Sequence, residues 1–150
     1  MTRDFAIFAL VLALQLPAIG VADQSCEKPT EPLMTTKSSW NAIYRAAVAL
    51  PPECFEGYFG EGISDVVVRK MGHDWAGFLA VVSRHHEDNR FFSVVLKSIN
   101  ATLNPDDIVA VYKQARTSCP ANLLARCAKI TAQSKAALAD YDPPRTVPPD

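Results

Sequence analysis

Hydrophobic residues recur every three or four positions along most of the chain, which is the period of an amphipathic α-helix. No strand pattern competes with it, because the valine run at 66–68 is short and flanked by helix signals. The spacing therefore predicts about six short helices. They cover residues 39–50 and 64–71, begin after Asp74, near Asp88 and after Asn104, and finish with a helix over residues 120–139.

Residues at the helix ends support these boundaries. Asn104 can cap the fifth helix, and Pro105 suits its first position. Gly72 is a typical stop for the second helix. The last helix is expected to turn inward Leu123, Leu124, Cys127, Ile130 and Leu138. Because the links are short, neighbouring helices should run antiparallel. The predicted fold is all-α, with helical hairpins packed into a small curved stack that resembles a helical repeat.

The first 22 residues have the pattern of a secretory signal peptide. Arg3 precedes an apolar run over residues 5–16, which is too short to span a membrane as a helix. Small residues follow, so cleavage is expected after Ala22, with Gly20 as the second choice. An uncleaved membrane anchor is the alternative. The mature protein is therefore expected to be periplasmic or secreted.

Composition divides the rest of the chain into three segments. Residues 23–35 contain two prolines and are expected to form an irregular leader. Residues 36–141 form the predicted helical domain. The segment 142–150 contains four prolines and is expected to be extended and disordered.

Four cysteines follow the predicted cleavage site, and an even number in an exported protein predicts disulfide bonds. Three pairings are possible, and the sequence alone does not choose among them. Pairing of sequence neighbours would join Cys26 to Cys54 and Cys119 to Cys127. The second of these bonds requires a helix break near Pro120, because eight helical residues rise about 12 Å and a disulfide reaches only about 7 Å.

The net charge of −1 bears on the choice of partner. A nucleic-acid-binding protein would show a basic excess or stripe, and an anionic membrane surface would attract a polybasic segment. Neither feature is present in the sequence. A protein partner is therefore expected, with no nucleic acid and no membrane span after cleavage. Helical packing of this kind is also compatible with a homodimer.

The ionisable clusters are explained by helix ends. His85 and His86 fall at the end of the third helix and the acids at 87–88 start the fourth, which is where the helix dipole favours each charge. No third metal ligand follows at a helical offset. The pair His73 and Asp74 similarly fits a turn and a cap. No serine-nucleophile motif is found, so catalytic residues are not expected. Metal ligands and cofactors are not expected either.

The segment 53–63 is the least ordinary stretch. Three glycines, three aromatic residues and three glutamates share its eleven positions, which predicts a structured loop with one helical turn. Aromatic rings are effective interface anchors, and glutamates would suit a basic partner groove. The alternative is that the rings fold inward and join the first two helices. The predicted partner-binding residues are Phe55, Glu56, Tyr58, Phe59 and Glu61.

In size, export signal, cysteine content and the helical make-up of residues 36–139, the chain resembles periplasmic immunity proteins that neutralise type VI secretion amidase effectors. The resemblance implies a small helical protein that blocks a cell-wall hydrolase by inserting a loop or helix into its active-site groove. It rests on no aligned motif, so segment 53–63 is the expected inserting element on composition alone. The expected function is a non-catalytic protein-binding module. The alternatives are an envelope enzyme whose site is assembled from separate helices, and an envelope structural or ligand-binding protein.

Overall fold

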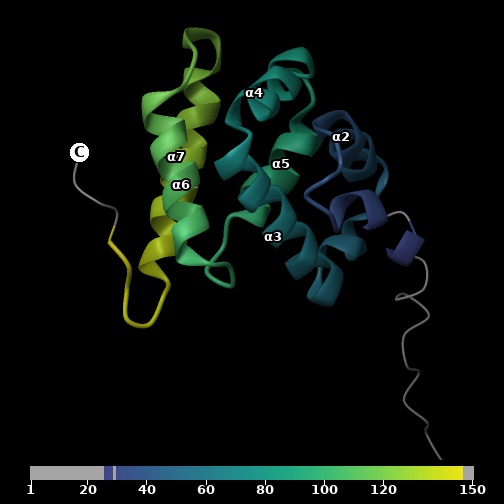
Figure 1. The fold of residues 1–150 in the computed structure, drawn as a ribbon, viewed down its shortest axis with the longest axis horizontal. Helices are drawn as coiled ribbons and strands as arrows, with labels where there is room; N and C mark the ends of the chain where they lie inside the picture. The colour runs from purple at the N-terminus through teal and green to yellow at the C-terminus, as the bar shows by residue number, and fades with distance from the viewer. Residues whose placement is uncertain (1–25, 29, 147–150) are drawn as a thin grey trace, which may run out of the picture.

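The computed structural model describes residues 26–28 and 30–146, and the predicted signal peptide lies outside this range. Within it the chain is helical and contains no strand, which confirms the all-α prediction (Figure 1). The α-helices are α2 (Trp40–Ala49), α3 (Gly57–His73), α4 (Trp75–Arg84), α5 (Asn89–Ser98), α6 (Pro105–Thr117) and α7 (Leu124–Ala139). Three 3-10 helices accompany them, η1 (Glu31–Leu33), η2 (Pro52–Phe55) and η3 (Ala121–Leu123).

Side-chain caps fix most of the helix starts that the sequence predicts. Asp74, Asp88 and Asn104 each accept a backbone N–H from the first turn of α4, α5 and α6, respectively. Ser39 does the same for α2, where its hydroxyl accepts from the N–H of Ala42. These caps satisfy donors that a helix start otherwise leaves without partners. The starts of these four helices therefore follow from local sequence.

The prediction for segment 53–63 is wrong in one respect: most of it is helix. Helix α3 begins at Gly57, several residues before the predicted start, and continues through Gly72 to His73. The three glycines of the segment favour a loop, because glycine is a poor helix former. Tertiary packing overrides this preference. Side chains at every fourth position of α3 are buried or half-buried, namely Phe59, Ile63, Val67 and Met71.

Helix α3 is the centre of the domain. It contacts α4, α5, α6, η1 and η2, so it packs against elements distant in sequence as well as its neighbours. The valine run at 66–68 is buried throughout, which a helix surrounded on several sides requires. The helices therefore pack around α3, and α6 and α7 form the most extensive helical hairpin (Figure 1).

The leader is more ordered than its two prolines suggest. Residues 26–28 and 30 are helical and η1 follows directly, whereas an irregular segment was expected. Leu33 is fully buried, and the disulfide Cys26–Cys54 joins the leader to η2 with a Cα–Cα distance of 5.5 Å. A covalent bond and a buried side chain therefore hold the leader against the domain.

The second disulfide, Cys119–Cys127, closes the tip of the α6–α7 hairpin, so the structure contains the pairing of sequence neighbours. The required helix break is present, because α6 ends at Thr117 and η3 follows Pro120. Leu124, predicted to face inward, is 60% exposed. It is the first residue of α7, and the preceding Leu123 is buried instead.

The start of the tail folds back on the domain. The Tyr141 hydroxyl donates to the Leu103 carbonyl, and the Arg145 N–H donates to the Leu138 carbonyl at 2.9 Å. Residues 142–146 are exposed and form no helix, as the prolines predict. The remaining tail residues lie outside the described range.

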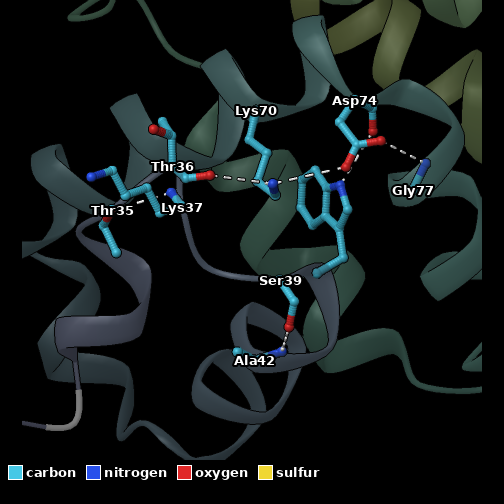
Figure 2. A network of polar contacts seen from close by, with 9 residues as sticks. Thr35, Thr36, Lys37, Ser39, Ala42, Lys70, Asp74 and Gly77 are labelled. Carbon is cyan, nitrogen blue, oxygen red and sulfur yellow. Dashed lines mark hydrogen bonds and ion pairs between the residues drawn. The ribbon is translucent and has the colours of Figure 1, made fainter.

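A polar network joins α2 to the junction between α3 and α4 (Figure 2). Lys70 donates to the Thr36 carbonyl at 3.3 Å and lies 3.8 Å from an Asp74 carboxylate oxygen. The indole N–H of Trp40 donates to the Asp74 carbonyl at 3.2 Å, and the Lys70 ammonium lies over the Trp40 ring. The contacts are between neighbouring elements of the fold, so we assign this network a structural role.

Candidate functional site

The five predicted partner-binding residues lie between the end of η2 and the second turn of α3. We call residues 55–61 the ridge, because hollows lie on both of its sides. Tyr58 is 76% exposed, and its ring packs edge-on against Phe59 with centroids 5.6 Å apart. Glu56 and Glu61 are exposed, whereas Phe55 and Phe59 are half-buried against the core. Tyr58 therefore points outward, and the two phenylalanines are folded partly inward.

The glycines of the ridge region serve close packing as well as a turn. Gly57 has a φ of +55°, a left-handed conformation that allows η2 to turn into α3. A Cβ on Gly60 would lie 2.3 Å from the Phe55 carbonyl oxygen, and a Cβ on Gly62 would lie 2.4 Å from the Met34 methyl carbon. These residues let η2 and the leader approach α3 closely. The first two turns of α3, from which Tyr58 projects, are therefore closely packed at Gly60 and Gly62.

One side of the ridge faces the leader across an open groove of about 620 Å³. We call it the leader groove. Tyr58 and Phe59 contribute its aromatic side, and Met34 its apolar side from beyond η1. The leader completes the lining with Glu27, Lys28, Thr30 and Glu31.

The other side of the ridge faces α5 across two smaller hollows of about 180 and 230 Å³. Phe55 lines both hollows, and Lys97 of α5 lines them from the opposite side. The Lys97 ammonium forms an ion pair with Glu56, which joins the ridge to α5. The structure therefore divides the predicted residues, with Tyr58 and Phe59 on the leader side and the other three on the α5 side.

The leader side of the ridge is acidic. Within residues 26–28 and 30–146, neither Glu27 nor Glu31 forms an ion pair. In the lining of the leader groove, two carboxylates face one ammonium group, that of Lys28. Exposed carboxylates beside an aromatic side chain favour a cationic partner group through charge attraction and cation–π contact.

The histidine-rich turn has a different environment. The Tyr44 ring stacks on His85 with centroids 3.8 Å apart, and its hydroxyl donates to Asp88 at 2.8 Å. The hydrogen bond from Tyr44, with those from the backbone N–H groups of Phe91 and Arg90, lowers the pKa of Asp88. The same bond raises the pKa of Tyr44. These contacts join α2 to the start of α5, and across the described ranges no group of three potential metal-binding side chains occurs.

Sequence reasoning missed the leader as part of the site. Glu27, Glu31 and Met34 lie outside the segment that composition singled out, and their position beside the ridge depends on the Cys26–Cys54 bond. One signal was present in the sequence. The pairing of cysteine neighbours brings residue 26 beside residue 54 and so places the leader next to the segment 53–63.

No helix within the described part of the chain is both long and apolar enough to cross a membrane. Comparison with family models, with characterised proteins and with solved structures finds no match to this chain. The geometry and chemistry of the ridge and its hollows are therefore the basis on which a function can be proposed.

Proposed function

We propose that the protein is an exported, non-catalytic binding module that recognises a basic surface of a protein partner through the ridge. The observation that carries the proposal is the exposure of Tyr58, which is 76% accessible although Gly60, on the same helix turn, packs closely against Phe55. A large aromatic side chain exposed on a rigid helix start is typical of an interface anchor, because little conformational entropy is lost when it is buried.

The charges beside Tyr58 support a basic partner. Glu56 is exposed but pairs with Lys97, whereas Glu61 on α3 and Glu27 and Glu31 across the leader groove are exposed and form no ion pair within the described ranges. Such a field increases the rate of encounter with a positive surface and disfavours a negative one. The ridge therefore has the hydrophobic anchor and the polar surround that a protein interface requires.

The export part of the proposal is supported by the two disulfides. Such bonds persist in oxidising compartments and are rare in the cytosol. Together with the predicted signal peptide they favour the periplasm or the cell exterior. A secreted hydrolase inhibited by the ridge is the specific partner that the resemblance to immunity proteins suggests.

The test uses the mature chain from Asp23, tagged at its C-terminus, as bait in envelope extract. We expect one stoichiometric partner, and we expect Tyr58→Ala and Glu56→Arg each to weaken its capture at least about tenfold, as loss of an interface anchor does. Leu124→Ala is the matched control, because Leu124 is the other large exposed hydrophobic residue of the described range and lies on α7. Inhibition of a hydrolase activity of the captured partner would support the immunity class.

Two results would contradict the proposal. In the first, both ridge variants capture the partner as well as the parent protein does. In the second, the Leu124 control loses capture as strongly as the ridge variants do. Circular dichroism of each variant confirms that the comparison is made between folded proteins.

A further inference from the structure

We infer that the leader groove receives an arginine or lysine side chain from an extended segment of the protein partner. This inference deepens the proposed function and rests on it. It adds a chemical requirement on the partner and brings in residues of the leader, which lie outside the ridge. Three properties of the groove support this occupant: its shape, its charge and its fixed position.

The shape of the groove suits a long side chain with an apolar stem. Tyr58 and Phe59 present aromatic surface on one side, and Met34 presents a flexible thioether near them. At about 620 Å³ the open groove has room for one long side chain together with its flanking backbone. The methylene stem of arginine or lysine packs on such surface while its charged head stays at the rim.

The charges of the groove select a cation. Glu27 and Glu31 are four residues apart, about one helical turn, and both line the leader side. Neither carboxylate is neutralised by an ion pair within the described ranges. A guanidinium or ammonium group at the rim would meet both carboxylates and the face of Tyr58. An anionic occupant would have Lys28 as its only basic neighbour among the lining residues and would meet two carboxylates.

The groove is held in place before any partner arrives. The Cys26–Cys54 bond joins the leader to η2, and the buried Leu33 holds η1 in the core. The Thr30 hydroxyl donates to the Cys26 carbonyl at 2.7 Å, which closes the helical turn between the two glutamates. A site of fixed geometry loses less entropy on binding than a mobile segment does.

The inference is tested with short peptides and the mature chain from Asp23. The probe is a fluorescein-labelled pentapeptide of sequence Ala-Leu-Arg-Leu-Ala. Its control contains citrulline in place of arginine, which keeps the shape and removes the charge. Fluorescence anisotropy at low salt should show the arginine peptide binding about tenfold more tightly, and this preference should shrink as salt is raised.

Protein variants then locate the site. The double variant Glu27→Gln/Glu31→Gln should lose the preference for arginine. The double variant Glu87→Gln/Asp140→Asn removes the same charge from exposed positions outside the groove and should keep the preference for arginine. The inference is overturned if the arginine peptide does not bind at millimolar concentration, if both peptides bind equally, or if the Glu27/Glu31 variant retains the preference.

Failure of this inference is distinguishable from failure of the proposed function. If the peptides show no preference while Tyr58→Ala still abolishes capture of the partner, the ridge binds a partner without a basic side chain in the leader groove. If capture is unaffected by Tyr58→Ala and Glu56→Arg, the proposed function itself is contradicted, whatever the peptides do.

Discussion

Gly60 lies where the carbonyl of Phe55 comes closest to α3. A Cβ at this position would lie 2.3 Å from the Phe55 oxygen, which is backbone and has little freedom to move. A Cβ on Gly62 would meet the end of the Met34 side chain, which can rotate away. The two glycines occupy the same helix and differ in what they contact. They therefore offer a matched pair for testing how the ridge is built.

We predict that Gly60→Ala destabilises the protein by about 2 kcal/mol, because the steric cost exceeds the gain in helix propensity of about 1 kcal/mol. Gly62→Ala should be close to neutral, because the same gain is offset by a modest shift of Met34. Urea unfolding followed by circular dichroism measures both values. Equal stability of the two variants would show that the backbone contact at Gly60 is unimportant.

The contact between Tyr44 and Asp88 gives the protein a pH-dependent stability. The hydrogen bond from Tyr44 lowers the pKa of Asp88 below its ordinary value of 3.8. Below that value the unfolded chain binds more protons than the native one, so stability falls as pH decreases through the native pKa. The pKa of Tyr44 is raised above 10.0, so its contribution is present below pH 10 and is lost as pH rises through the native value.

We predict that Asp88→Asn reduces the loss of stability on acidification, because asparagine still caps α5 but does not titrate. Tyr44→Phe should weaken both the acid and the alkaline dependence, because it removes the shared hydrogen bond. Unfolding free energies measured by urea titration from about pH 2 to about pH 11 provide the test. An unchanged acid limb in Asp88→Asn would exclude this pair as its source.

At the scale of elements, the two disulfides have different structural roles. Cys119–Cys127 spans 8 residues and closes a hairpin whose helices already pack extensively. Cys26–Cys54 spans 28 residues and joins the leader to η2, beside the ridge. A longer enclosed loop restricts the unfolded chain more strongly. The first bond therefore reinforces local packing, and the second also positions one side of the leader groove.

We predict that Cys26→Ala/Cys54→Ala lowers stability by about 3–4 kcal/mol, and that Cys119→Ala/Cys127→Ala lowers it by about 2–3 kcal/mol. Only the first variant should make residues 26–34 sensitive to limited proteolysis, because non-covalent packing, chiefly of Leu33 and Met34, then holds the leader without a covalent bond. Denaturant unfolding and mass spectrometry of the cleavage products measure the two effects. Equal protection of the leader in both variants would contradict the role given to Cys26–Cys54.

At the scale of the whole molecule, the two tryptophans join elements that are distant in sequence. The Trp40 indole connects α2 to the α3–α4 junction, and the Trp75 indole donates to the Ser118 carbonyl at 3.1 Å. Trp75 thereby links α4 to the end of α6. Helix α3 contacts α4, α5 and α6, and α2 and α7 each pack against one or more of these three helices.

We predict one cooperative unfolding transition, in which tryptophan fluorescence and far-ultraviolet circular dichroism change together. Trp75→Phe should keep most of the buried contact but lose the hydrogen bond to Ser118, at a cost of about 1 kcal/mol or somewhat more. Separate transitions by the two probes would indicate that the α6–α7 hairpin unfolds on its own.

The sequence by itself determined the helical class, four of the helix starts and most of the buried faces. These features are local, because a capping side chain acts within one turn and an amphipathic period is visible in any stretch of ten residues. The face of α7 is an example, since Cys127, Ile130 and Leu138 are buried as their spacing predicts.

Only the tertiary structure decided the extent of α3, the exposure of Leu124 and the composition of the leader groove. The glycines at 57, 60 and 62 indicate a loop when each is considered alone. In the structure Gly57 supplies a positive φ before α3 continues, and Gly60 and Gly62 allow close contact of the helix with Phe55 and Met34. The groove depends on a bond between residues 28 positions apart. Local propensity carries no information about contacts between residues that are distant in sequence, so the effect of these contacts appears only when the chain is folded.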